Sequence, residues 1–334
     1  MEKLLLIRTD SLGDNVLFSS VLPHIREYFK GWEITLTCRE NVKPLYDSCP
    51  FVDEVTCING CYKKDYDLAI NPVYSRTILS DSLTFESGAK KTIAFRGDKQ
   101  NISPDEISRW EDNNKKYSKL IDIPLEHNSG EIDKYYYLLE ELGIIARDLK
   151  TQVWIEPGIC AYKDHIVIFC GGGWPPKYVY NLGRSLNDFI DDDTTVIALG
   201  GPYEWFVNQV NLEYIKCGKK INLCDETSLL QAMHIIKNSK LVIGVDTGLG
   251  HIACALDKDN IILAGGGHPG RFFPYHKQTI LVRKEMDCYG CNWRCTIGKK
   301  IDCMDIPDEI IKENISLKLK PVNNKKIKQG ENLI

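Results

Sequence analysis

The stretch GVDTGLGHIACAL, residues 244–256, contains the turn that decides how the second half of the chain folds. It follows the apolar run from Leu241 to Ile243 and leads into small residues, so we expect a strand, a tight turn and a helix. Two interpretations fit Asp246, Thr247 and the glycines of this turn. Backbone N–H groups at the start of the helix meet an anion, or the turn simply needs glycine for a positive φ.

Strand-like runs recur along the whole chain and indicate its fold class. The second half has six of them, separated in several places by helical segments: HIVIFC, TTVIALGG, KKINLC, KLVIGVD, NIILAGG and QTILVR. The first half has LLLIR, EITLTC, DEVTCI and YDLAINP, then the polar stretch RGDKQNISPDEISRWEDNNKK, expected to be a surface excursion, and a helix around EIDKYYYLLEELGI. This alternation predicts an α/β fold built from βαβ units with mostly parallel sheets.

Two successive patterns of similar length predict two doubly wound domains, residues 1–155 and 156–317, followed by a polar basic tail at 318–334. Sites in such sheets lie beyond the carboxyl ends of the strands. In a paired arrangement, the two sets of loops are therefore expected to face each other across a cleft.

The composition excludes some classes of protein. The chain has 334 residues and a net charge of -4, which leaves no basic excess for binding nucleic acid. The opening MEKLLLIRTDSLGDN has too short an apolar stretch for a signal peptide, and no apolar run is long enough to span a bilayer. We therefore expect a cytoplasmic protein in which most of the thirteen cysteines are reduced.

A second informative turn, RTDSLGD at residues 8–14, follows the first strand. At this place the carboxylate of Asp14 could accept a proton from an attacking hydroxyl, or it could serve as a helix cap. Arg8 could pair with a phosphate or with a neighbouring carboxylate.

Glycines follow several strands of the second half, at residues 171–173, 200–201 and 265–267, and Lys177 stands close to the first group. No G-x-G-x-x-G fingerprint or G-x-x-x-x-G-K-[ST] loop occurs at the required position, which weakens a nicotinamide dehydrogenase or an ATPase. So many glycine turns at strand ends favour a nucleotide-type ligand over plain turns.

Taken together, these motifs resemble glycosyltransferase family 9, the bacterial heptosyltransferase-like group. The pattern R-x-x-x-x-G-D (Arg8, Gly13 and Asp14) is similar to the opening of that family, and residues 246–251, DTGLGH, are similar to its D-T-G-L-S-H turn. The resemblance covers most of the chain. Gly250 stands where the family has serine, Ser20 where many members have proline, and GGGWPPKYVYNL only loosely matches the family's lysine-arginine-tryptophan-proline pattern.

The resemblance implies the GT-B architecture, with two Rossmann-like domains facing each other, and inverting transfer from a nucleotide-activated sugar. Asp14 would be the general base, Thr247 and Gly248 would offer N–H groups to the diphosphate, Asp246 would lie near the donor sugar, and Lys177 would contact the phosphate. His251 joins this site or only orients the turn, and Arg271 could face donor or acceptor. The full set expected at the donor is Gly13, Gly172, Lys177, Asp246, Thr247, Gly248, His251 and Arg271.

Four cysteines near the C-terminus form the pattern C-x2-C-x3-C-x7-C: Cys288, Cys291, Cys295 and Cys303. Four thiolates on one zinc or iron ion, two disulfides, and free thiols all fit this spacing. The segment is similar to the four-cysteine iron-binding finger of autotransporter heptosyltransferases, which implies a structural element and no metal at the transfer chemistry.

The resemblance implies transfer of a heptose or related sugar to a bacterial surface glycan, such as lipopolysaccharide core. ADP-heptose would be the donor, a glycan or glycolipid the acceptor, and no cofactor would be required for transfer. The basic tail could touch an anionic membrane at the inner face of the inner membrane. The alternatives are a nucleotide-sugar epimerase or hydrolase of the same architecture and a non-catalytic metal-binding scaffold.

Overall fold

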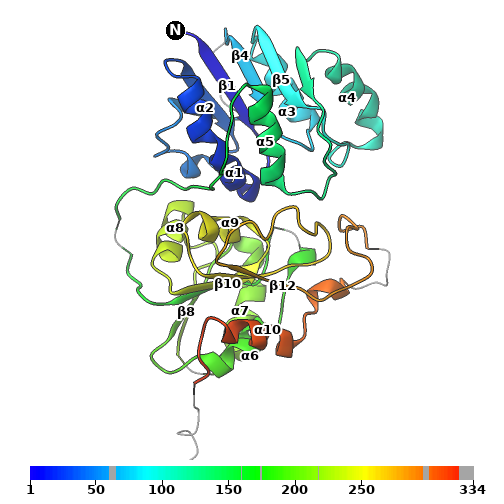
Figure 1. The fold of residues 1–334 in the computed structure, drawn as a ribbon. Helices are drawn as coiled ribbons and strands as arrows, with labels where there is room; N and C mark the ends of the chain where they lie inside the picture. Colours follow the sequence, from blue (N-terminus) through cyan, green and yellow to red (C-terminus); the bar gives the residue numbers. More distant parts are fainter. Residues whose placement is uncertain (60–64, 159, 174, 217, 296–300, 323–334) are drawn as a thin grey trace, which may run out of the picture. The chain divides into compact units, whose positions relative to one another are not determined.

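The structure of the chain is a computed structural model that describes residues 1–59, 65–158, 160–173, 175–216, 218–295 and 301–322. It divides into two compact units, Met1–Pro157 and Gly158–Ile334, which Figure 1 shows in colours from blue to green and from green to red. Three parts of the sequence-based predictions lie outside the described residues: Trp174, residues 296–300 of the cysteine segment, and the tail from 323 to 334.

The first unit contains a parallel sheet with the strand order β3-β2-β1-β4-β5-β6. Its strands are β1 (Lys3–Arg8), β2 (Glu33–Cys38), β3 (Glu54–Cys57), β4 (Leu68–Asn71), β5 (Lys91–Phe95) and β6 (Lys119–Ile121). Its helices are α1 (Leu12–Phe18), α2 (Leu22–Tyr28), α3 (Ile78–Glu86), α4 (Ile107–Asn114) and α5 (Glu131–Glu141), with short 3-10 turns η1 (Ser19–Val21), η2 (Lys43–Leu45) and η3 (Pro104–Glu106).

The second unit repeats this plan, with the parallel order β12-β11-β10-β7-β8-β9. Its strands are β7 (Ile166–Phe169), β8 (Thr195–Ala198), β9 (Lys219–Asn222), β10 (Leu241–Val245), β11 (Asn260–Leu263) and β12 (Thr279–Val282). Its helices are α6 (Leu182–Leu186), α7 (Trp205–Tyr214), α8 (Leu229–Lys237), α9 (Gly248–Ala255) and α10 (Asp308–Ser316), with 3-10 turns η4 (Pro175–Lys177), η5 (Asn187–Phe189), η6 (Pro202–Glu204) and η7 (Asp302–Met304).

The two sheets confirm the predicted doubly wound α/β fold. The central strand β1 is apolar and fully buried from Leu4 to Ile7, as expected of a parallel strand covered on both faces. All six runs predicted in the second half are strands. In each sheet the strand order reverses beside the first strand, between β1 and β4 and between β7 and β10. Ligand sites of doubly wound sheets lie at these switch points.

The polar stretch at residues 96–116 is more than the surface excursion expected from its composition. It contains η3 and α4, and Trp110 on α4 packs with Ile78 and Ile102 in a small hydrophobic cluster. Trp110 attaches this helix to the rest of the unit, with Ile107 packed against the same cluster, while its other residues are mostly polar and exposed. The strands on either side of the stretch, β5 and β6, are the last two strands at one edge of the first sheet.

Within the ranges that the structure describes, no helix combines the length and the apolar character needed to cross a bilayer.

Candidate functional site

Arg8 is the centre of a buried polar network at the carboxyl end of β1, beside the switch point of the first sheet. Its side chain is fully buried, and its Nη1 donates to the main-chain oxygen of Pro72, directly after β4, at 2.8 Å. Its Nε lies 2.9 Å from Oδ1 of Asp10, and its Nη2 lies 3.8 Å from Oδ1 of Asp14. The structure thus favours the carboxylate partner for Arg8 over the phosphate that the sequence had left open.

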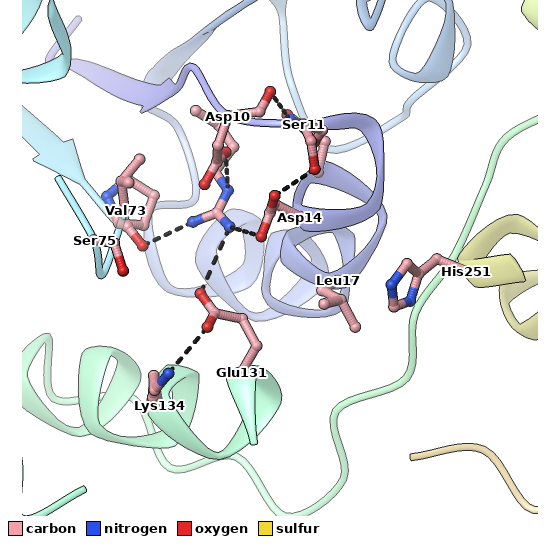
Figure 2. A network of polar contacts seen from close by, with 12 residues as sticks. Asp10, Ser11, Asp14, Leu17, Val73, Ser75, Glu131, Lys134 and His251 are labelled. Carbon is pink, nitrogen blue, oxygen red and sulfur yellow. Dashed lines mark hydrogen bonds and ion pairs between the residues drawn. The ribbon is translucent and has the colours of Figure 1, made fainter. Parts of the chain in front are cut away.

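Asp14, the predicted base, lies in the first turn of α1, and Gly13 is buried beside it. The side chain of Asp14 is 16% exposed. Ser11 Oγ donates to Oδ2 of Asp14 at 2.5 Å (Figure 2). A half-buried carboxylate held by a hydroxyl and a guanidinium is a suitable group for accepting a proton.

The network includes two residues that sequence analysis missed, Glu131 and Lys134 of α5. Oε1 of Glu131 lies 3.8 Å from Nη2 of Arg8, and its Oε2 lies 3.1 Å from Nζ of Lys134, so α5 supplies both a carboxylate and a cation (Figure 2). Both side chains are almost fully buried. The spacing E-x-x-K on one helix was the available signal, but it does not identify a partner 123 residues earlier in the chain.

Electrostatics keep the guanidinium of Arg8 charged. Burial by itself lowers the pKa of Arg8, but the carboxylates, chiefly Asp10, outweigh burial and hold this pKa above its ordinary value. The ring centroids of Phe18 and Tyr135 lie 5.5 Å and 5.6 Å from the guanidinium carbon. The positive charge of Arg8 is therefore paired with carboxylates and flanked by two aromatic rings.

A second group of predicted residues meets at the switch point of the second sheet. Lys177, in η4 after β7, donates from Nζ to the main-chain oxygen of Asp246 at 2.9 Å and lies 3.4 Å from its carboxylate. Gly172 faces Thr247: a Cβ added to Gly172 would lie 2.6 Å from Thr247 Cγ2. The turn after β7 and the turn after β10 therefore touch, and a glycine is needed for this approach.

Thr247 is the N-cap of α9, and Gly248 is its first helical residue. The Thr247 side chain makes no capping bond, and among the described residues its buried Oγ1 has no hydrogen-bond partner. The first N–H groups of a helix also lack partners within the helix. Together with the ammonium of Lys177, these donors form a suitable site for an anion.

His251 lies one turn further along α9 and is buried. Its ring stacks on Phe273 with centroids 4.3 Å apart, its Nδ1 lies 3.0 Å from the hydroxyl of Tyr275, and its Nε2 lies 3.9 Å from Oδ1 of Asp246. These contacts place His251 between the carboxylate of Asp246 and the rings of Phe273 and Tyr275.

Arg271, predicted to face a ligand, is 8% exposed, and its guanidinium carbon lies 5.0 Å from the ring centroid of Phe272. Phe273 is also buried, in keeping with the packing role of aromatic residues.

The cysteine segment packs on the glycine run at residues 265–267. Cβ atoms added to Gly265 and Gly267 would lie 2.6 Å and 2.2 Å from the ring of Trp293, and one added to Gly266 would lie 2.2 Å from the ring of Tyr289. These three glycines make room for aromatic rings, which is a packing reason that differs from the ligand reason inferred from the sequence.

The four cysteines differ in exposure: Cys303 is buried, Cys288 and Cys291 are half-buried, and Cys295 is exposed. Burial raises the pKa of Cys303, and the thiols of Cys288 and Cys291 raise it further, so these groups lie within electrostatic reach of one another. In the described ranges, no three side chains of His, Cys, Asp or Glu are grouped closely enough to hold a metal ion.

We compared the chain with protein families, with curated proteins and with solved structures. Residues 174–301 match the model of "Glycosyltransferase family 9 (heptosyltransferase)". The chain is 21% identical to lipooligosaccharide heptosyltransferase 2 of Haemophilus ducreyi, over 84% of this chain and 88% of that protein.

Two solved structures have the same fold over nearly the whole chain. A glycosyl transferase family 9 protein of Veillonella parvula superposes with a TM-score of 0.75 at 16% identity, covering 95% of this chain and 96% of that one. The ADP-heptose LPS heptosyltransferase II of E. coli superposes with a TM-score of 0.73 at 17% identity, covering 95% and 98%. The chain therefore has the fold of these glycosyltransferases, and its residues 174–301 are similar to glycosyltransferase family 9.

Proposed function

We propose that this protein is an inverting glycosyltransferase that moves a heptose or related sugar from an ADP-activated donor to a bacterial surface glycan, such as lipopolysaccharide core. The unit Gly158–Ile334 would bind the donor, and the unit Met1–Pro157 would activate the acceptor. The observation that carries the proposal is the contact between Lys177 and the Asp246 turn at the start of α9.

The donor diphosphate would be bound by Lys177, the Thr247 hydroxyl and the first N–H groups of α9. This assignment is supported by the unpartnered Thr247 Oγ1 among the described residues and by the cation 2.9 Å from the Asp246 carbonyl. Negative charge grows on the leaving diphosphate during transfer, and donors fixed around it stabilise that charge most in the transition state. Asp246, next to these groups, would bind hydroxyl groups of the donor sugar.

Asp14 would take the proton of the acceptor hydroxyl. The hydroxyl oxygen then bonds to the anomeric carbon on the side opposite the nucleotide, the bond from that carbon to the diphosphate oxygen breaks, and the electron pair leaves with the nucleotide. Attack from the opposite side inverts the configuration. The support for Asp14 is its partly exposed carboxylate, held by Ser11.

The four-cysteine segment would be a structural element that binds a soft metal such as zinc or iron. Its thiols interact electrostatically, but in the part of the chain that the structure describes they do not lie close enough together to bind one metal ion. Metal binding would therefore require this segment to rearrange. No step of the transfer is assigned to a metal. Reduced thiols suit the cytoplasm, where we propose that the enzyme works, at the inner face of the inner membrane when its acceptor is a glycolipid.

The first test is a thermal-shift titration with ADP, GDP, UDP, CDP and dTDP. A ligand that binds only the folded chain raises its apparent melting temperature. A selective shift with ADP is expected. If another nucleotide gave the selective shift, the transferase proposal would stand, but ADP-heptose would be excluded as the donor. Equal shifts with all five nucleotides, or no shift at all, would contradict the proposed donor site.

The second test concerns the base. Asp14→Asn keeps the shape of the side chain but cannot take a proton, so we expect nucleotide binding to persist and transfer to fall by about 10²-fold or more. Asp122→Asn is the matched control, because Asp122 pairs with Arg96 on an exposed surface of the same unit. Equal turnover of D14N and D122N would contradict the role of Asp14.

A further inference from the structure

The ammonium of Lys177 has a third neighbour besides the two oxygens of Asp246. It lies over the indole ring of Trp293, a residue of the cysteine segment, with Nζ 5.8 Å from the ring centroid. A cation within about 6 Å of the face of a tryptophan ring is attracted to that face. The cation assigned to the donor diphosphate is therefore held by two segments: the turn that opens α9 and the cysteine segment.

The ring of Trp293 is fixed in the core of the second unit. Trp293 is 9% exposed and belongs to the same hydrophobic cluster as Met304. A Cβ added to Gly265 would lie 2.6 Å from the ring, and one added to Gly267 would lie 2.2 Å from it. The ring of His268 meets it edge-on, with the centroids 6.4 Å apart. Because the interior is closely packed, the ring has little room to move away from Lys177.

The main chain brings Trp293 to this place against its local preference. The N–H of Gly290 donates to the main-chain oxygen of Gly266 at 2.8 Å, and the N–H of Asn292 donates to that of Gly267 at 3.0 Å. Asn292 and Trp293 both have a positive φ, 50° and 59°. Residues other than glycine adopt this left-handed region rarely, and a bulky one stays there only where its surroundings hold it. The contacts of the indole ring supply such surroundings.

A lysine needs this kind of support to bind an anion well. Its charge lies at the end of a flexible four-carbon stem, and ordering the stem on binding weakens the affinity. The carboxylate of Asp246, 3.4 Å from Nζ, fixes the ammonium but also competes with a diphosphate for it. The face of Trp293 attracts the ammonium without adding a second negative charge, so it restrains the cation and does not repel the anion.

We propose that Trp293 is a positioning residue of the donor site, whose ring holds the Lys177 ammonium in place for the diphosphate. This inference rests on the proposed function, since it needs Lys177 to bind the donor. Trp293 acts through Lys177. The proposal gives the cysteine segment a part in donor binding, besides the structural part described above.

A ring that only fills the core predicts a different result. Its loss would loosen the second unit and weaken nucleotide binding whether or not Lys177 is present. A ring that acts through the ammonium matters only while the ammonium is there. Two residues that act through one contact give effects that do not add, so a double-mutant cycle separates the two cases.

The cycle measures the dissociation constant of ADP, by calorimetry, for the wild type, Trp293→Leu, Lys177→Met and the double variant. We expect W293L to bind ADP about fivefold more weakly than the wild type, because the ammonium loses its restraint. In the K177M background, W293L should change the constant by less than about twofold. An equal loss in both backgrounds, or no loss in W293L alone, would overturn the proposal.

Two further ligand-binding results distinguish positioning from packing. Trp293→Phe keeps an aromatic face and should bind ADP within about twofold of the wild type. Adenosine has no diphosphate, so W293L should bind it as the wild type does. A loss of adenosine affinity equal to the loss for ADP would show a general distortion of the unit and contradict the role of Trp293.

The matched control is Trp110→Leu. Trp110 is also a buried tryptophan beneath a cation, with the guanidinium carbon of Arg76 5.4 Å from its ring centroid, but it belongs to the first unit. W110L should lower stability and leave the affinity for ADP unchanged. A loss of ADP affinity in W110L as large as that in W293L would remove the specific role of Trp293.

If W293L does not fold, Gly267→Ala replaces it in the cycle. The added Cβ would lie 2.2 Å from the ring, so the ring must shift, whereas Gly173→Ala, whose Cβ meets nothing within 4 Å, is the control. The expected outcomes are the same. The failures are distinguishable: a wild type that binds no nucleoside diphosphate contradicts the donor site and this inference with it, whereas ADP binding with additive losses contradicts only the role of Trp293.

Discussion

Lys177 and Asp246, 69 positions apart, meet where the turns after β7 and β10 touch: Nζ of Lys177 donates to the Asp246 main-chain oxygen at 2.9 Å and lies 3.4 Å from its carboxylate. The lysine thus holds the turn that opens α9 and keeps one cation at the first N–H groups of that helix. A bound diphosphate would meet both, so this pair links the fold of the second unit to its chemistry.

Lys177→Met should remove the cation and leave most of the fold unchanged. We expect kcat/KM for the nucleotide sugar to fall by about 10²-fold, because a fixed donor to the leaving group is lost. The control is Lys220→Met, which removes a lysine that donates to the main-chain oxygen of Ile215 at 2.8 Å. Steady-state kinetics test this prediction: equal activity of the K177M and K220M variants would contradict the role of Lys177 at the diphosphate.

Gly172→Ala tests the contact between the two turns. The new Cβ would lie 2.6 Å from Thr247 Cγ2, so the Thr247 turn must move, and we expect a smaller thermal shift with the nucleotide than in the wild type. Gly173→Ala is a close control, because a Cβ there meets nothing within 4 Å. Loss of the shift in both variants would indicate a general effect on the loop and not a contact with Thr247.

A buried ion pair should dominate the stability of the first unit. Arg76 lies 2.7 Å from Asp81, and both side chains are fully buried. Arg76→Met leaves the carboxylate without its cation, and we expect the free energy of unfolding to fall by about 3–5 kcal/mol. The exposed pair of Arg96 with Asp122 should contribute only about 0–1 kcal/mol, so Arg96→Met is the control. Urea unfolding that gives similar losses for both would contradict this ranking.

The cysteine segment can be tested by metal analysis. If it binds a metal, the purified chain should carry about one zinc or iron ion, and the double variant C288S/C291S should carry none. Cys57→Ser is the control, since Cys57 is a thiol on β3 far from this segment in sequence. Elemental analysis with equal metal content in the double variant and the control would remove the metal-binding role.

Much of the fold could be predicted from local pattern alone. The six runs of the second half are short, apolar and followed by glycine or polar turns, and each one is a strand. The predictions were weaker where apolar character is sparse. β6 has only three residues, and α4 packs mainly through Trp110, so neither has a strong periodic signal.

The candidate sites could be predicted in part. Asp14, Lys177, Asp246 and Thr247 follow the ends of strands by one to eight residues, so their place at the carboxyl edges of the sheets follows from chain order. Gly265 to Gly267 show the limit of this reasoning. They resemble ligand turns in the sequence, but the rings of Trp293 and Tyr289 occupy the space beside them.

The sequence by itself determined the two α/β patterns, the turns at their strand ends and the resemblance to family 9, because each depends on residues close together in the chain. Only the tertiary structure decided which charges share the buried space at Arg8. Glu131 lies near Arg8, and pairs there with Lys134, because α5 packs beside α1. That contact depends on sheet order and helix packing, which no local pattern in the sequence records.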